Sequence, residues 1–176
     1  MKLKGLIKKF IDNEDGISLI EFAFLLPVML VLLIGTVEVS NILRIDRKVT
    51  QAAHTAVDLI GQASSINDAE FADILVAVEL SVFPYAENNL SLGVSSVEFD
   101  ITDGTASVGW TESLRGGVVD NAIAQTVDLE VAGYSVVVAK AGYSYQPLFN
   151  NFLFDGFEIE ETAYGRPRNS LVVVRE

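Results

Sequence analysis

The sequence predicts an α+β protein with a long N-terminal transmembrane and amphipathic helix, a second short helix and a mostly antiparallel C-terminal β-sheet. Three features indicate this class. An apolar run of membrane-spanning length covers residues 17–37, and a 3.6-residue apolar period follows over residues 38–63. From about Leu90 the apolar period changes to two, which is typical of strands. Helices followed by runs of strands indicate an α+β fold.

The composition limits the function classes. The 176 residues suffice for one modest globular domain beside a membrane segment. A net charge of −12 argues against nucleic-acid binding, because phosphate contacts require clustered Lys and Arg. The chain has no cysteine and one histidine, His54, which leaves little material for a metal site or a catalytic triad. We therefore expect no metal, no cofactor and no small-molecule substrate.

The first 37 residues have the charge pattern of a membrane-inserted N-terminus. As a helix, residues 17–37 reach about 30 Å, one hydrocarbon core. Lysines precede this run, so the positive-inside rule places the N-terminus in the cytoplasm and the rest beyond the membrane. No convincing small-residue site of signal cleavage follows the run. The flanking lysines and the length disfavour a buried core helix. These lysines are Lys2, Lys4, Lys8 and Lys9.

Glu21 is the one strongly polar residue of the apolar run, and an isolated carboxylate in hydrocarbon costs several kcal/mol. Cleavage after Gly16 would make Ile17 a new N-terminus with an α-ammonium. That ammonium can pair with Glu21 of a neighbouring, axially staggered helix, which removes much of this cost. We therefore hypothesise that Glu21 promotes assembly through this pairing. The alternative is a plain membrane anchor with a chance carboxylate.

Pro27 lies inside the same run, where it removes one backbone hydrogen bond and tends to kink the helix. A role in helix packing and a harmless kink in an anchor are about equally supported. In a membrane, neighbouring helices can satisfy the freed carbonyl.

The string DGISLIEFAFLLPVMLVLLIGTVEVSNILRIDRKVTQAAHTAVDLI resembles the TadE-like family over roughly the first third of the chain. The shared features are a glycine, a Glu-Phe-Ala triplet, a proline in the apolar run, a glycine near its end followed by a glutamate, and an Ala-rich continuation. They are Gly16, Glu21-Phe22-Ala23, Pro27, Gly35, Glu38, Ala52-Ala53 and Ala56. Gly16, Ile17, Glu21 and Phe22 also resemble the prepilin-peptidase site of type IV pilin-like proteins.

The resemblance implies a minor pilin, or pseudopilin, of the tight-adherence (Tad/Flp) type IV pilus system, which serves cell adhesion and biofilm formation. The implied partners are a prepilin peptidase, other pilins or pseudopilins, Tad inner-membrane components and membrane lipid. The implied location is a single pass through the bacterial inner membrane, with the C-terminal domain extracytoplasmic and incorporation in the pilus as a further option. The predicted division is leader 1–16, transmembrane helix 17–37, amphipathic continuation 38–63 and exported α+β domain 64–176.

Residues 38–63 are expected to be an amphipathic continuation of the membrane helix. Ile45, Val49, Ala52, Ala53 and Ala56 lie on one face of the continuation, while Arg44, Arg47, Lys48 and His54 lie on the other, near lipid headgroups or in water. A second helix follows. Asn67 is expected to cap it with Glu70, and Ile66 with Phe71 to form a hydrophobic staple. Pro84 ends this region.

The later segments predict strands and turns. The sequence TDGT predicts a hairpin turn, which explains Asp100 and Asp103 better than a calcium site does. Shifts of the alternation at Ser95-Ser96 and Ala132-Gly133 predict bulges or bends. Further strands are expected in TVDLEVAGYSVVVAKAGYSYQPLF and FEIEETAYGRPRNSLVVV, the last of them in SLVVV.

Two groups of charged residues are candidates for function in this region. Glu158, Glu160 and Glu161 are interpreted as a solvated strand face rather than as a catalytic pair. Arg166 and Arg168 are candidates for binding a carboxylate of a partner or of the same domain, or for a plain polar connection.

Two rival functions are compatible with the sequence. One is a bitopic membrane-anchored envelope binding or sensor module. The other, less supported, is an enzyme, because the sequence has no nucleophile elbow, metal cluster or phosphate loop.

Overall fold

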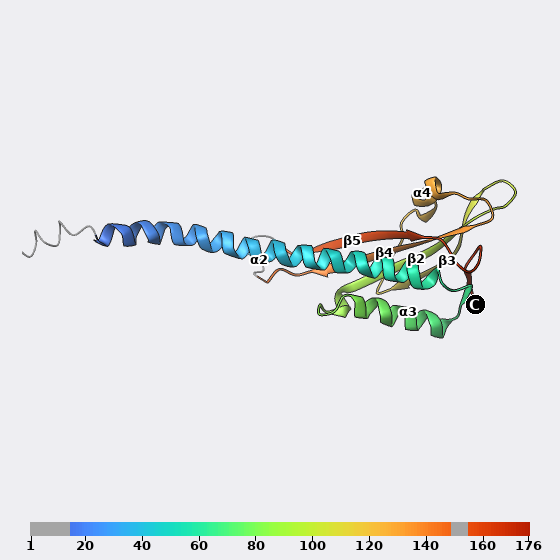
Figure 1. The fold of residues 1–176 in the computed structure, drawn as a ribbon, viewed down its shortest axis with the longest axis horizontal. Coiled ribbons are helices and arrows are strands. Elements are labelled where there is room, and N and C mark those ends of the chain that lie inside the picture. Colours follow the sequence, from blue (N-terminus) through green and yellow to red (C-terminus); the bar gives the residue numbers. More distant parts are fainter. Residues whose placement is uncertain (1–14, 149–154) are drawn as a thin grey trace, which may run out of the picture. The chain divides into compact units, whose positions relative to one another are not determined.

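The fold is the predicted α+β arrangement, seen in a computed structural model that describes residues 15–148 and 155–176 (Figure 1). Most of the predicted leader therefore lies outside the described residues. Two compact units meet between Ser40 and Asn41. In chain order the elements are α2 (Asp15–Ile60), β1 (Ser65–Ile66), α3 (Asp68–Ser81), η1 (Glu87–Asn89), β2 (Leu90–Phe99), β3 (Ala106–Leu114), α4 (Ala122–Thr126), η2 (Val127–Leu129), β4 (Ser135–Tyr145), β5 (Phe157–Gly165) and β6 (Val174–Arg175).

In the first unit, α2 exposes large apolar side chains on all sides. Leu19 is 71% exposed and Phe24 is 77% exposed, and the side chains between Gly16 and Leu32 are exposed throughout. A helix that is apolar all round is stable in a membrane or in the core of a large protein. It is the one helix among the described residues that is long and apolar enough to cross a bilayer.

In the second unit, the remainder of α2 is amphipathic as predicted. Its buried face consists of Ile45, Val49, Ala52, Ala53, Ala56, Val57 and Ile60. His54 and Gln51 lie on the exposed face. The small alanines allow close approach of the neighbouring elements, which form one hydrophobic core with this face.

Helix α3 begins with the predicted capping box. The Glu70 N–H donates to Asn67 Oδ1 at 3.0 Å, and the Asn67 N–H donates to Glu70 Oε2 at 3.1 Å. Such a cap contributes about 1 kcal/mol of helix stability. Ile66 and Phe71 are both buried in the main core, as the predicted staple requires.

The four long strands form an antiparallel sheet in the order β3-β2-β4-β5. The predicted hairpin turn joins β2 and β3. There Asp100 Oδ1 accepts from the Thr102 N–H at 2.6 Å, and Asp103 Oδ1 accepts from the Thr105 N–H at 2.9 Å. Gly104 has a φ of 71°, which an L-residue rarely adopts. Both aspartates are therefore turn residues. Ile101 also lies in this turn and is 77% exposed.

Both faces of the sheet are covered by apolar clusters. The apolar side chains of β2 therefore change from one face of the sheet to the other near Ser95-Ser96. Leu90, Leu92 and Val94 belong to the main core with α2 and α3, whereas Val97 and Phe99 belong to a second cluster on the other face. The register irregularity falls between Ser96 and Val97, as expected, but the extra residue is Gly109 of β3. Against β4, strand β2 pairs without a break.

Two strand predictions were wrong. Residues 122–129, within which a strand was expected to start, form α4 and η2, because one turn of helix also satisfies a short apolar-polar alternation. The bend expected at Ala132-Gly133 is a turn before β4, where Gly133 has a φ of 80°. The segment SLVVV contributes only the start of β6, which pairs in parallel with β1 rather than with the main sheet.

Candidate membrane and assembly site

The predicted processing site lies in the first described turn of α2. Gly16 and Ile17 have helical backbone, and the space around a Cβ built on Gly16 is open.

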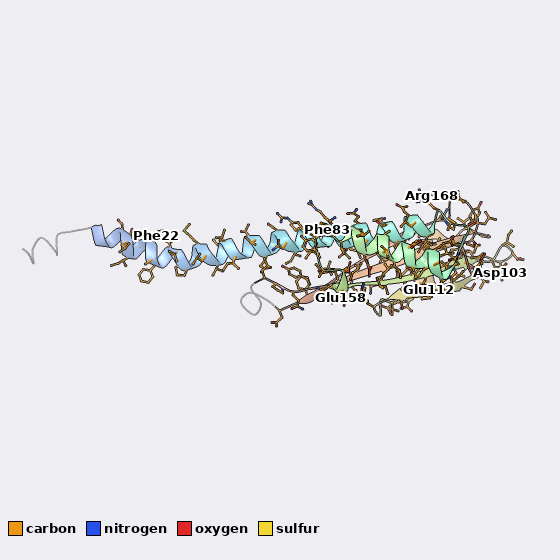
Figure 2. The ribbon with its side chains drawn as sticks, turned by 90° about the horizontal axis from the view of Figure 1, so that it is seen from below. Phe22, Phe83, Asp103, Glu112, Glu158 and Arg168 are labelled. Carbon is orange, nitrogen blue, oxygen red and sulfur yellow. The ribbon has the colours of Figure 1, made fainter. Side chains whose placement is uncertain are left out.

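Ile17 and Glu21 are four residues apart on α2, so their side chains lie on the same face, one turn apart. Ile17 is 54% exposed and Glu21 is also exposed. Phe22 adjoins them, labelled on α2 in Figure 2, and is likewise exposed. A carboxylate on the lipid-facing surface of a helix needs a partner from another chain or from the headgroup layer.

Pro27 lies inside α2 without ending it. Because proline has no N–H, the carbonyl of Ala23 lacks the donor that every other turn supplies. Ala23 follows Glu21 by two residues and has a small side chain. An acceptor and a carboxylate thus lie close together in an otherwise apolar segment.

Arg166 and Arg168 both make contacts within the second unit. Arg166 Nη2 donates to the carbonyl of Leu129 at 2.8 Å, and Arg168 Nη2 contacts Asp58 Oδ1 at 2.6 Å. The Arg168 N–H donates to the carbonyl of Gly61 at 2.7 Å, just beyond the end of α2. Arg168 therefore fixes the C-terminal end of this helix and binds a carboxylate of its own domain, whereas Arg166 binds η2.

A polar hollow of about 180 Å³ lies on the outer face of the sheet, and sequence analysis did not identify it. At its centre Lys140 Nζ contacts Glu160 Oε1 at 2.9 Å and Asp120 Oδ2 at 3.7 Å. The hydrogen bond to Glu160 raises the pKa of Lys140. Glu158 also lines the hollow, whereas Glu161 does not. A lysine within the apolar strand β4, taken together with Glu158 and Glu160, is the sequence signal that could have located it.

The hollow has no nucleophile with a paired base. Among the described residues, no group of three His, Cys, Asp or Glu side chains is arranged to hold a metal ion. The Lys140 ammonium is engaged by Glu160, so the arrangement is that of a stabilising ion pair on the sheet surface.

Comparison with known proteins identifies the helix. Residues 16–58 match the family model described as TadE-like protein. No curated protein and no solved structure shows significant similarity to the chain. This segment is similar to TadE-like proteins, which is consistent with a pilin-like protein associated with the Tad pilus system. The long apolar helix fits a single-pass membrane anchor.

Proposed function

We propose that this protein is a minor pilin, or pseudopilin, that a prepilin peptidase cleaves after Gly16 and that is required for assembly of a Tad/Flp-type adhesion pilus. The observation that carries the proposal is the exposed carboxylate of Glu21, one helical turn from Ile17, inside the segment that matches the TadE-like family. No other exposed position between Ile17 and Val37 carries a charge.

The helix geometry defines how such a pair would form. Ile17 and Glu21 are four residues apart, which corresponds to about 6 Å along a helix axis. A neighbouring copy displaced by that distance brings its α-ammonium level with Glu21. Inside hydrocarbon, each charge then neutralises the other. Because the pair forms only between neighbouring helices, it stabilises the assembled state relative to the isolated helix. The carbonyl of Ala23, freed by Pro27, offers the ammonium a second acceptor close by.

The proposed topology follows the distribution of lysines. The N-terminus, with Lys2, Lys4, Lys8 and Lys9, lies in the cytoplasm, residues 17–37 cross the bacterial inner membrane, and residues 64–176 form an exported domain. Partners are the peptidase, other pilins or pseudopilins and the Tad inner-membrane components. The role is structural rather than catalytic.

The first test is the N-terminal sequence of the protein recovered from membranes of cells with and without their prepilin peptidase. We expect chains that begin at Ile17 only in the presence of the peptidase. Chains that retain Met1 in both strains would contradict the proposal and favour a bitopic binding module, whose ligand site the hollow around Lys140 would offer.

The second test is Glu21→Gln, which keeps the shape of the side chain and removes its charge. We expect normal cleavage and an intact outer domain, but lateral association weakened at least a hundredfold, because removing one partner of a buried ion pair costs about 3–5 kcal/mol. Pilus yield, counted by electron microscopy, measures the effect. Glu21→Asp is the matched control, because it retains the charge and should retain part of the yield. Normal pili from Glu21→Gln would refute the pairing role.

A further inference from the structure

The end of α3 carries an apolar surface that the core leaves uncovered. Val76, Leu80 and Phe83 follow one another at helical spacing, and they are 53%, 66% and 72% exposed. Their exposure increases toward the C-terminal end of the helix. Apolar residues exposed singly are normal, but a contiguous exposed apolar surface is typical of interaction sites.

Basic side chains lie beside this end of α3. Lys48 Nζ donates to the carbonyl of Ser81 at 3.1 Å, which places the last turn of α3 next to the beginning of the second unit's part of α2. Figures 1 and 2 show the two helices side by side, running in opposite directions. Arg44 precedes Lys48 by one turn and lies on the same side of α2, and Arg47 is also exposed.

The charge of this surface contrasts with the rest of the domain. From residue 41 onward, acidic residues outnumber basic residues by more than two to one. Three of the basic residues nevertheless fall within the five positions from Arg44 to Lys48, with Asp46 as the one acid among them. Glu79, the nearest acid on α3, is paired with Arg115 at 2.5 Å, and Glu87 lies further along the chain.

This surface follows the apolar run closely along the chain. Arg44 lies seven positions after Val37, the end of the apolar run, which corresponds to about 10 Å of helix. The headgroup layer extends about 5–8 Å beyond the hydrocarbon on each side. Long arginine side chains reach several Å along a helix, so their guanidinium groups fall within reach of lipid phosphates.

We infer that Leu80, Phe83, Arg44, Arg47 and Lys48 form a membrane-docking surface, the docking foot, which rests on anionic lipid headgroups. The basic residues bind the phosphates while Phe83 and Leu80 enter the boundary between headgroups and acyl chains, where aromatic and aliphatic groups are stable. Docking would fix the orientation of the acidic domain on the bilayer. The inference rests on the membrane anchor of the proposed function but does not depend on cleavage or pilus assembly.

Because the chain has no cysteine, one introduced cysteine can be labelled alone. Spin-labelled Phe83→Cys and Ile101→Cys full-length proteins are reconstituted in nanodiscs that contain phosphatidylglycerol, which leave both leaflets open to water. Collision with oxygen reports immersion in lipid, and collision with a water-soluble nickel chelate reports exposure. Ile101 is the matched control, because its side chain is equally exposed in the turn after β2.

We expect the oxygen-to-nickel ratio at position 83 to exceed that at position 101 several-fold. Adding Arg44→Gln and Arg47→Gln should lower the docked-to-undocked ratio about thirtyfold, because each basic residue near an anionic surface contributes about a fivefold factor. Nanodiscs of phosphatidylcholine alone should likewise return the label to water. These variants leave Lys48 and its bond to Ser81 intact.

Three results would overturn the docking foot. The first is equal water exposure at positions 83 and 101 in anionic nanodiscs. The second is immersion that the arginine substitutions do not change. The third is spin–spin broadening at position 83 that vanishes with one chain per nanodisc, which would assign the surface to a second copy. A label at Leu26 distinguishes the proposals, because its absence from hydrocarbon would refute the anchor itself.

Discussion

At the scale of single residues, Arg168 shows how a charge distant in sequence can complete a helix. The last turn of α2 contains no basic residue, although cations are favoured at helix C-termini. Arg168 supplies that charge from 110 positions away, pairs with Asp58 and caps the carbonyl of Gly61. The sequence left three options for Arg168, a carboxylate of a partner, a carboxylate of its own domain or a plain polar connection, and the folded chain pairs it with Asp58.

We expect Arg168→Ala to lower the free energy of unfolding by about 0.5–1 kcal/mol, because both partners are more than half exposed and solvent screens the pair. Denaturant titration of the full chain in detergent micelles measures the change. Asp58→Ala and the double variant complete a thermodynamic cycle. A coupling energy of zero in this cycle would show that the Arg168 side chain is free to serve a partner instead.

The residues near the N-terminus could be interpreted from the sequence for a different reason. Gly16, Ile17, Glu21 and Pro27 derive their interpretation from local spacing along one helix, and the periodicity of α2 is a local property. Arg166, Asp120 and Lys140 derive theirs from contacts between segments far apart in the chain. No local pattern encodes which distant carbonyl or carboxylate will be adjacent, so these contacts required the structure.

At the scale of elements, the segment after β3 crosses the outer face of the sheet at two glycines. A Cβ on Gly93 of β2 would lie 2.8 Å from the backbone of Val118, and a Cβ on Gly117 would lie 2.3 Å from the backbone of Leu92. Two backbones can therefore pass each other only because both positions lack a side chain. The crossing carries the chain toward α4, which covers the second hydrophobic cluster.

Gly93→Ala is expected to destabilise the protein by about 3 kcal/mol, because the added methyl group meets backbone atoms that cannot rotate away, as in an overpacked core. Thermal unfolding in micelles, followed by circular dichroism, is the measurement. Ser107→Ala, on the exposed part of β3, is the control and should change stability by less than about 0.5 kcal/mol. An unchanged melting temperature for Gly93→Ala would contradict the close crossing.

The elements themselves were predictable where one local rule decides them. The capping box of α3 involves Asn67 and Glu70, three residues apart, and the hairpin after Phe99 depends on an adjacent Asp-Gly pair. The short helix α4 was missed because five residues give too little periodicity to distinguish a helix from a strand. The parallel pairing of β1 with β6 joins segments more than 100 residues apart, and the sequence offers no signal for it.

At the scale of the whole second unit, the C-terminus closes the domain through Arg175. Its guanidinium contacts Asp68 at 2.5 Å and Glu112 at 2.9 Å, and its centre lies 5.5 Å from the centroid of the Phe71 ring. It also donates to the carbonyl of Ile66 at 3.0 Å. These contacts raise the pKa of Arg175, chiefly through the hydrogen bond to Asp68. One side chain thus joins the start of α3, strand β3 and the last strand.

Removing this side chain should destabilise the whole second unit. We expect Arg175→Ala to lower the free energy of unfolding by about 2 kcal/mol, since hydrogen bonds to charged groups contribute about 1.5–3 kcal/mol each and Asp68 remains hydrated after the loss. Arg175→Lys keeps the charge but not the fork of donors, so it should retain part of the stability. The single tryptophan, Trp110, is a built-in reporter, because its Nε1 donates to the carbonyl of Val173 at 2.8 Å.

Two spectroscopic probes decide whether Arg175 stabilises the whole second unit or only strand β6. If Arg175 holds the unit together, Trp110 fluorescence and far-ultraviolet circular dichroism should shift together to lower denaturant concentration in Arg175→Ala. Coincident transitions indicate one cooperative unit. If the tryptophan signal changes first, β6 detaches alone and Arg175 secures only the terminus. Unfolding at the wild-type denaturant concentration by both probes would show that the surrounding core, through Val173 and Ile66, closes the domain without Arg175.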